Sequence, residues 1–291
     1  MTPSKNLPPL DWNRVNTLIA MALTEDVGDG DATSLAVIPA GTRAAAKFVT
    51  RQECVCAGLE VAAAVFKALD PGSRWTPNAA DGDKLPPDAV MASVKGDARA
   101  LLTGERSALN FLQRLCGVAT TASRYAAACS GKTVVLDTRK TTPGWRNLEK
   151  YAVAAGGASN HRVGLHDRIM VKDNHRFLAG LEGKGAIARS VERSRAAYPT
   201  LEVEVEADTL DEVAEAVAAK ADYILLDNMG NAQMAEAVKI NRGVAKLEAS
   251  GNITLERIPS ICALGVDFIS CGALTHSVKA VDISMETTLE D

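Results

Sequence analysis

The second half of the chain alternates between short apolar runs and amphipathic helical segments, and this alternation limits the folds that are open to it. The runs are TVVLDT (133–138), DRIMVKD (167–173), LEVEVE (201–206), DYILLDN (222–228), KLEASG (246–251) and DFISCG (267–272). Segments with helical periodicity, such as 210–220 and 231–240, separate several of them. Such alternation is typical of parallel strands joined by crossover helices. We therefore predict an α/β barrel of parallel strands over residues 119–276.

The first part of the chain has a mixed pattern and predicts a separate domain over residues 1–118. Helical spacing of apolar residues covers 12–23 and 59–69, strand-like runs cover 44–49 and 90–96, and the proline-containing segment 71–89 predicts turns plus an edge strand. The polar segment 25–34 predicts a loop. A long apolar stripe over 103–128 predicts a helix that connects the two domains.

Composition narrows the possible partners and compartment. The chain has 291 residues, a formal net charge of -4 and no Lys/Arg-rich run, which argues against nucleic acid or a membrane surface as a partner. No apolar stretch approaches the roughly 20 residues that span a bilayer. The six cysteines form no CxxC pair, and the N-terminal stretch has no apolar signal core. We therefore expect reduced thiols and a cytoplasmic protein.

Many cations lie within or beside the strand-like runs between residues 137 and 175. They are Arg139, Lys140, His161, Arg162, Arg168, Lys172 and His175. A buried charge costs several kcal/mol unless it is compensated, so a cluster of this kind is normally solvated, paired or occupied by a ligand of opposite charge. The cluster predicts an anionic ligand.

Each predicted strand ends in polar residues or glycine. These endings are Arg139/Lys140, Lys172/Asp173, Glu206, Asp227/Asn228, Ser250/Gly251 and Gly272. In α/β barrels the carboxyl ends of the strands form the active site, so we expect these residues to meet at one face.

Carboxylates at two of these strand ends could serve a metal ion or ribose hydroxyls. In LEVEVEA the period of two places Glu202, Glu204 and Glu206 on one face of the strand, where they need basic side chains or a metal ion. Glu206 and Asp227 end successive strands and could orient hydroxyls or hold Mg²⁺ through water. The histidines match no familiar zinc spacing, and the nearby cations would oppose a dication.

Two glycine-bearing turns, 249–254 (ASGNIT) and 270–277 (SCGALTHS), follow the last two predicted strands. Backbone N–H groups in such turns can approach a phosphate closely, and the last two strands of α/β barrels often form a phosphate site. Arg106 lies far from all these residues in the sequence, and alone it predicts no more than a surface salt bridge with an acid such as Glu105.

Taken together, the motifs resemble the quinolinate phosphoribosyltransferase family over nearly the whole chain. The matching motifs are EDVGDGDATS, GERSALNFLQRLCGVAT, DTRKTTPGWR, GGASNHRVGLHDRIMVKDNH, EVEVEA, ILLDNM, EASGNIT and SCGALTHS. The resemblance implies an N-terminal α/β sandwich, joined by the C-terminal segment 277–291, and an open α/β barrel. Two positions depart from the family pattern, because Cys271 replaces a common valine and Cys116 an expected serine.

The same resemblance implies the substrates and the residues that bind them. Quinolinate and phosphoribosyl pyrophosphate would react with Mg²⁺ to give nicotinate mononucleotide, pyrophosphate and CO₂ in NAD biosynthesis, with Lys140, Lys172, Glu206 and Asp227 as catalytic residues. The implied binding residues are Arg106, Thr138, Arg139, Lys140, His161, Arg162, Lys172, Glu206, Asp227, Ser250, Gly251, Asn252, Cys271, Gly272 and Ala273. In this family the helix arginine, here Arg106, reaches the neighbouring subunit's site, which implies a homodimer.

Three other functions remain open at this point. One is a molybdenum-transport-associated paralogue with the same fold. Another, from a different class, is a lyase that forms a Schiff base on Lys172, since desolvated lysines can be nucleophilic. The third is a binding protein without catalytic activity.

Overall fold

The computed structural model of the chain describes residues 7–181 and 183–289. Residues 1–6, part of the stretch without an apolar signal core, and residues 290–291, the end of segment 277–291, lie outside the described residues. The chain forms two compact units. The first comprises Met1–Ser123, Thr142–Gly157 and Ser277–Asp291, and the second comprises Arg124–Thr141 and Ala158–His276. A boundary between folding domains at residue 118 remains a prediction.

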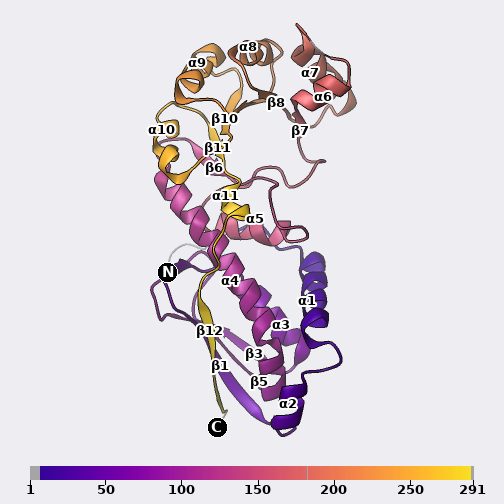
Figure 1. Ribbon diagram of the computed structural model, residues 1–291, viewed down its shortest axis with the longest axis vertical. Helices are drawn as coiled ribbons and strands as arrows, with labels where there is room; N and C mark the ends of the chain where they lie inside the picture. Colours follow the sequence, from indigo (N-terminus) through magenta and orange to yellow (C-terminus); the bar gives the residue numbers. More distant parts are fainter. Residues whose placement is uncertain (1–6, 182, 290–291) are drawn as a thin grey trace. The chain divides into compact units, whose positions relative to one another are not determined.

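An antiparallel four-stranded sheet organises the first unit (Figure 1). Its strands, in spatial order, are β12 (Ile283–Leu289), β1 (Arg43–Thr50), β5 (Val90–Asp97) and β3 (Arg74–Pro77). Two short strands, β2 (Cys54–Val55) and β4 (Lys84–Leu85), pair with each other. The helices of this unit are α1 (Trp12–Val27), α2 (Ala32–Val37), α3 (Leu59–Leu69), most of α4 (Ala98–Ala128) and α5 (Arg146–Ala155).

Segments far apart in the sequence share the core of this sheet. The C-terminal strand β12 pairs with β1, from Ala44 opposite Leu289 to Thr50 opposite Ile283. Phe48 of β1 is fully buried, and its ring lies 5.8 Å from Phe66 of α3 and 5.2 Å from Trp75 of β3. Burial of these large aromatic side chains stabilises the packing of helix on sheet.

The predicted loop over residues 25–34 is wrong for most of its length. Helix α1 continues to Val27, and α2 begins at Ala32, so only residues 28–31 connect them. Asp31 caps α2, because its carboxylate accepts the backbone N–H of Ser34 at 3.0 Å and also contacts the Ser34 hydroxyl. An aspartate in a polar segment can therefore start a helix as well as mark a turn.

Glycine permits a close approach of α4 and the end of α5. A Cβ on Gly156 would lie 2.3 Å from the backbone oxygen of Ala119 and 2.7 Å from the Cβ of Ala122. We expect Gly156→Ala to lower the free energy of unfolding by about 1–3 kcal/mol, because the backbone of α4 has to move.

Thermal unfolding of Gly156→Ala and Gly230→Ala would check this expectation. Both glycines have negative φ values, -69° and -75°, so alanine strains neither backbone. At Gly230 the nearest atom to an added Cβ is 3.8 Å away, and we expect little change there. Equal melting temperatures for the two variants would contradict the role of the close approach.

Six parallel strands form the second unit (Figure 1). In spatial order they are β6 (Val134–Leu136), β11 (Phe268–Ser270), β10 (Lys246–Ser250), β9 (Tyr223–Asp227), β8 (Val203–Ala207) and β7 (Ile169–Val171). The helices are α6 (Asp173–Leu178), α7 (Ala186–Ala197), α8 (Leu210–Ala218), α9 (Asn231–Asn241), α10 (Ile258–Cys262), α11 (Ala273–His276) and the 3₁₀ helix η1 (Leu255–Arg257). The predicted fold class, α/β with an open barrel of parallel strands, is confirmed.

Valine and glutamate side chains alternate along β8 and so lie on opposite faces of the strand, as the sequence predicts. Val203 and Val205 are fully buried and alternate with Glu204 and Glu206 along the strand. Thr209 then caps helix α8, because its hydroxyl accepts the N–H of Glu212 at 3.2 Å. This capping arrangement ends the strand and turns the chain back along the sheet.

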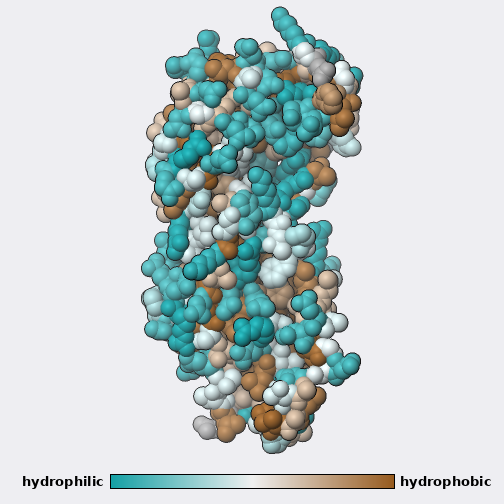
Figure 2. Space-filling model, viewed as in Figure 1, coloured by the Kyte–Doolittle hydropathy of each residue, from teal (hydrophilic) through white to brown (hydrophobic). Residues whose placement is uncertain are grey.

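The surface of the second unit includes exposed apolar side chains on α6. Phe177 is 63% exposed and Leu178 is 82% exposed, and Figure 2 shows hydrophobic (brown) atoms in the region of α6 and α7, at the upper right of the view. Within the described part of the chain, no helix combines the length and the apolar character needed to cross a membrane.

Candidate active site

A cavity of about 430 Å³ lies in the second unit, where the strand ends carry polar side chains. The predicted site residues that line it are Thr138, Arg139, Lys140, His161, Arg162, Lys172, Glu206, Asp227, Ser250, Gly251 and Asn252. Parallel register explains why they meet. Asp227 of β9 is in register with Ser250 of β10, and Glu206 of β8 is in register with Leu225 of β9.

Two arginines give the cavity its cationic character. Burial, followed by the positive charge of Arg139, lowers the pKa of Arg162. The Arg162 guanidinium donates to the backbone oxygen of Arg168 at 2.9 Å, which fixes its direction. Two guanidinium groups that repel each other in a partly buried cavity favour the binding of an anion.

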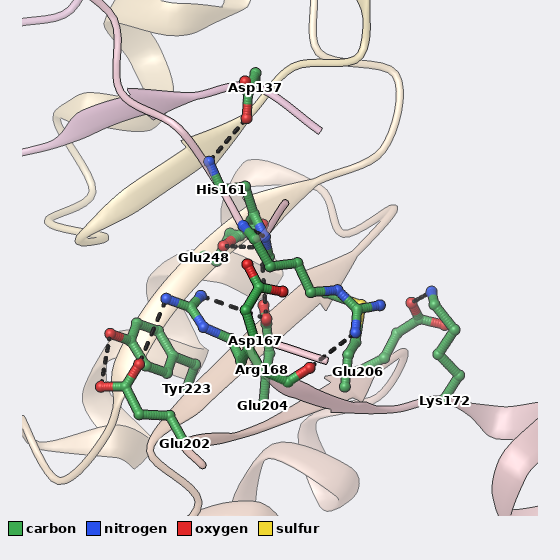
Figure 3. A network of polar contacts seen from close by, with 12 residues as sticks. Asp137, His161, Asp167, Arg168, Lys172, Glu202, Glu204, Glu206, Tyr223 and Glu248 are labelled. Carbon is green, nitrogen blue, oxygen red and sulfur yellow. Dashed lines mark hydrogen bonds and ion pairs between the residues drawn. The ribbon is translucent and has the colours of Figure 1, made fainter. Parts of the chain in front are cut away.

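Lys172 and Glu206 form an ion pair at the neighbouring ends of β7 and β8 (Figure 3). The Lys172 side chain is 41% exposed and that of Glu206 is 12% exposed. The backbone N–H of Lys172 donates to Nδ1 of His175 at 3.0 Å, which holds the start of α6. The ion pair therefore fixes the direction of the Lys172 side chain at the cavity wall.

A buried cluster of His161, Glu204 and Glu248 lies beside the cavity (Figure 3). His161 Nε2 lies 3.4 Å from Glu204 and 3.2 Å from Glu248. Burial lowers the pKa of His161, but hydrogen bonding and the negative charges of both glutamates outweigh it and raise the pKa to about 9. Burial also raises the pKa of Glu204. Both shifts therefore favour a proton held between the His161 ring and the glutamates.

This cluster has the composition of a metal site, but the hydrogen bonds of the ring oppose one. Nδ1 of His161 accepts the backbone N–H of Arg162 at 2.7 Å. Nε2 then carries a proton in the neutral ring as well as in the charged one, so the nitrogen that faces the glutamates has no lone pair for a metal ion. Arg168, whose Nη1 is 3.6 Å from Glu204, adds a further positive charge.

Glu206 and Asp227 fit a different role, because they face the open cavity. Asp227 accepts the side-chain amide of Asn228 at 2.8 Å. Two carboxylates with an adjacent lysine suit a hydrated Mg²⁺ that is shared with a phosphorylated substrate, since Mg²⁺ retains water ligands.

The turn after β10 depends on glycine. Gly251 has φ of +92°, and a Cβ there would lie 2.2 Å from Oδ1 of Asn228. Asn252, with φ of 49°, donates its side-chain amide to the same oxygen at 3.3 Å. The tight turn brings backbone N–H groups to the cavity wall, as the phosphate prediction requires.

The models of the quinolinate phosphoribosyl transferase N-terminal and C-terminal domains match residues 31–116 and 118–286. The chain belongs to the quinolinate phosphoribosyltransferase family. It is 42% identical over 290 residues to the probable nicotinate-nucleotide pyrophosphorylase (carboxylating) of Synechocystis sp., covering 98% of this chain and 95% of that one. It is 43% identical over 271 residues to the corresponding Bacillus subtilis protein, covering 92% and 91%.

Solved structures show the same relationship. The crystal structure of NadC from Streptococcus pyogenes matches with a TM-score of 0.92 and 37% identity, covering 98% of this chain and 100% of that one. The nicotinate-nucleotide pyrophosphorylase from Francisella tularensis matches with a TM-score of 0.89 and 39% identity, covering 99% and 100%.

Three residues that the family motifs imply do not line the cavity. Cys271, Gly272 and Ala273 are absent from its wall, which Ser270 lines instead. Cys271 is 1% exposed, and its N–H donates to the backbone oxygen of Leu136 at 2.9 Å. Burial raises the pKa of the Cys271 thiol to about 12, so little reactive thiolate forms.

Arg106, the remaining residue of the family set, lies exposed on α4 in the first unit. It lines a cavity of about 320 Å³ together with Asp26 and Asp31. Asp31 also accepts the hydroxyl of Thr103 at 3.1 Å, so the connection between α1 and α2 is fixed beside this arginine.

Five residues line the main cavity that the sequence did not assign to the quinolinate phosphoribosyltransferase site. They are Met170, Leu225, Asn228, Glu248 and Ser270. Glu248 has a recognisable signal, because it is a charged residue between two apolar residues, Leu247 and Ala249, in the middle of a parallel strand. Met170 and Leu225 lack one, since apolar residues in such strands are ordinary core residues.

Proposed function

We propose that the chain transfers the phosphoribosyl group of phosphoribosyl pyrophosphate to quinolinate with decarboxylation, giving nicotinate mononucleotide, pyrophosphate and CO₂ in NAD biosynthesis. Family membership supports this reaction. The observation that carries it is the pair Arg139 and Arg162 in one cavity, since two guanidinium forks suit the two adjacent carboxylates of quinolinate. His161 and Lys172 supply further polar contacts beside them.

The second substrate would occupy the part of the cavity near the strand ends. Glu206 and Asp227 face the ribose hydroxyls, Lys140 and Lys172 lie near the pyrophosphate, and the turn Ser250–Asn252 holds phosphate. The family motif also assigns the turn Cys271–Ala273 to phosphate, but this turn lies outside the cavity wall and the N–H of Cys271 donates to Leu136. Mg²⁺, when bound by Glu206 and Asp227 through water, would neutralise phosphate charge.

The cavity residues then perform the displacement without a protein nucleophile. The quinolinate ring nitrogen forms a bond to the ribose carbon as the bond from that carbon to pyrophosphate breaks. Positive charge develops at the ribose carbon, and the carboxylates of Glu206 and Asp227 stabilise it.

Decarboxylation follows from the charge of the product. The cationic pyridinium stabilises the electron pair left on the ring carbon when CO₂ departs, and that carbon then takes a proton. The protein holds the ring and anchors the remaining carboxylate through the arginines. Lys172 is unsuited to Schiff-base chemistry, because its Nζ is engaged in an ion pair with the Glu206 carboxylate.

The assembly and compartment are part of the same proposal. We infer a homodimer in which Arg106 of one protomer completes the site of its partner, in agreement with the exposure of Arg106. The six free thiols suit the reducing cytoplasm.

The test is product formation from quinolinate, phosphoribosyl pyrophosphate and Mg²⁺, with nicotinate replacing quinolinate in a parallel reaction. We expect nicotinate mononucleotide and an equal amount of CO₂ with quinolinate only, because nicotinate lacks the second carboxylate. Product from nicotinate, or none from either compound with folded protein, would contradict the proposal. The second result would favour the molybdenum-associated paralogue or a binding protein.

A further inference from the structure

Glu204 is fully buried inside the second unit, and it does not line the cavity. Its carboxylate lies between two residues of the segment 161–168, His161 and Arg168 (Figure 3). Nε2 of His161 is 3.4 Å away, and Nη1 of Arg168 is 3.6 Å away. One buried carboxylate thus contacts both ends of a segment whose middle is a loop.

Arg162 is attached to the same two residues. Its backbone N–H donates to Nδ1 of His161 at 2.7 Å, and its guanidinium Nη1 donates to the backbone oxygen of Arg168 at 2.9 Å. The backbone and the guanidinium of Arg162 are therefore held by two residues, His161 and Arg168, whose side chains Glu204 contacts. A shift of either support would move the guanidinium relative to the cavity.

Other groups hold these supports in place. The backbone N–H of His161 donates to Asp137 at 2.8 Å. The carboxylate of Glu248, which belongs to β10, lies 3.2 Å from Nε2 of His161. The Arg168 guanidinium stacks 4.0 Å from the ring centre of Tyr223. The groups that hold His161 and Arg168 lie on β8, β9 and β10 and directly after β6, so the loop that carries Arg162 is held from the strands.

Hydrogen-bond donors and positive charge face the buried carboxylates of the network. Glu204 and Glu248 both face Nε2 of His161, and Glu204 also faces the Arg168 guanidinium. Carboxylates that are neutralised in this way do not repel an anionic ligand in the adjacent cavity, and the cations of the cavity wall remain available to it.

We propose that Glu204, assisted by Glu248, is a positioning residue for the quinolinate site: it holds His161 and Arg168 so that Arg162 points at a carboxylate of the substrate. The inference rests on the proposed function and deepens it. Small displacements of a binding group are costly, because a guanidinium fork binds a carboxylate through two aligned hydrogen bonds.

The experiment compares Glu204→Gln with Glu202→Gln in the full chain. Glu202 lies just before β8 and also contacts Arg168, at 3.6 Å, but its side chain is 57% exposed, whereas that of Glu204 is fully buried beside the His161 ring. Quinolinate binding by calorimetry and the KM values of both substrates are measured. For Glu204→Gln we expect a loss of quinolinate affinity on the order of 10- to 100-fold. We expect an unchanged KM for phosphoribosyl pyrophosphate, and less than about a twofold change for Glu202→Gln.

A double-mutant cycle with Arg162→Lys identifies the route of the effect. If Glu204 acts through Arg162, the two losses of quinolinate affinity do not add, whereas independent effects add. Additive losses, an unchanged quinolinate affinity, or an equal rise of both KM values would overturn the inference. If Glu204→Gln does not fold, Glu248→Gln decides by the same measurements. Failure of the wild-type chain to bind quinolinate would instead overturn the proposed function.

Discussion

Arg139→Ala is expected to abolish useful quinolinate binding while the fold stays intact. Truncation leaves a desolvated carboxylate of the ligand without its charge-assisted partner, at a cost of about 2–5 kcal/mol. This cost corresponds to at least about 30-fold in affinity. The fold should not suffer, because the positive charge of Arg139 already contributes to the lowered pKa of Arg162, and its removal relieves that repulsion.

Calorimetric titration with quinolinate and thermal unfolding of the same samples check both parts. Arg139→Lys is the matched variant, since it keeps the charge and loses the planar fork. We expect an affinity between those of the wild type and the alanine variant. Unchanged affinity in Arg139→Ala would count against the assignment of this cavity to a dicarboxylate.

Gly251→Ala is expected to damage both stability and the binding of phosphoribosyl pyrophosphate. With φ of +92°, alanine adopts this conformation at a cost of about 1–2 kcal/mol. In addition, its Cβ would lie 2.2 Å from Oδ1 and 2.8 Å from the backbone nitrogen of Asn228. Relief of that contact displaces Asn228 and disrupts its hydrogen bonds to Asp227 and Asn252, for a further cost of about 1–3 kcal/mol.

Gly265→Ala separates the two contributions. Gly265 has a similar φ of +86°, but no atom lies within 4 Å of an added Cβ. Only the backbone cost applies there, so its melting temperature should fall less than that of Gly251→Ala, and binding of phosphoribosyl pyrophosphate should persist. Equal losses of stability in the two variants would show that the contact with Asn228 does not matter.

Much of the barrel could be predicted because its strands are short apolar runs with period-two patterning. The run 201–206 shows this, since Val203 and Val205 are buried and alternate with the glutamates. Local capping was harder to predict, because the residues of segment 25–34 favour both turns and helix starts. The hydrogen bonds of Asp31 to Ser34 and Thr103 decide in favour of a helix start, and Thr103 lies in a distant helix.

For the candidate site too, some features could be predicted from the sequence and others could not. Strand ends are visible in the sequence, so Arg139, Lys172, Glu206 and Asp227 could be predicted to share a cavity before their contacts were known. Cys271 belongs to an equally clear motif, but its side chain is buried and its N–H donates to Leu136. Motif order therefore predicts which strand ends meet, whereas the direction of each side chain depends on packing.

The sequence by itself determined the strand order along the chain, the cationic and carboxylate endings of the strands, and the family. The strands and their endings follow from local periodicity and residue type, and the family follows from the resemblance of the motifs in their order along the chain. Only the tertiary structure decided that Glu204 and Glu248 converge on His161, and that Arg162 rests on His161 and Arg168. These contacts join β8, β10 and the segment 161–168, and their partners are chosen by the register of parallel strands, which no local pattern specifies.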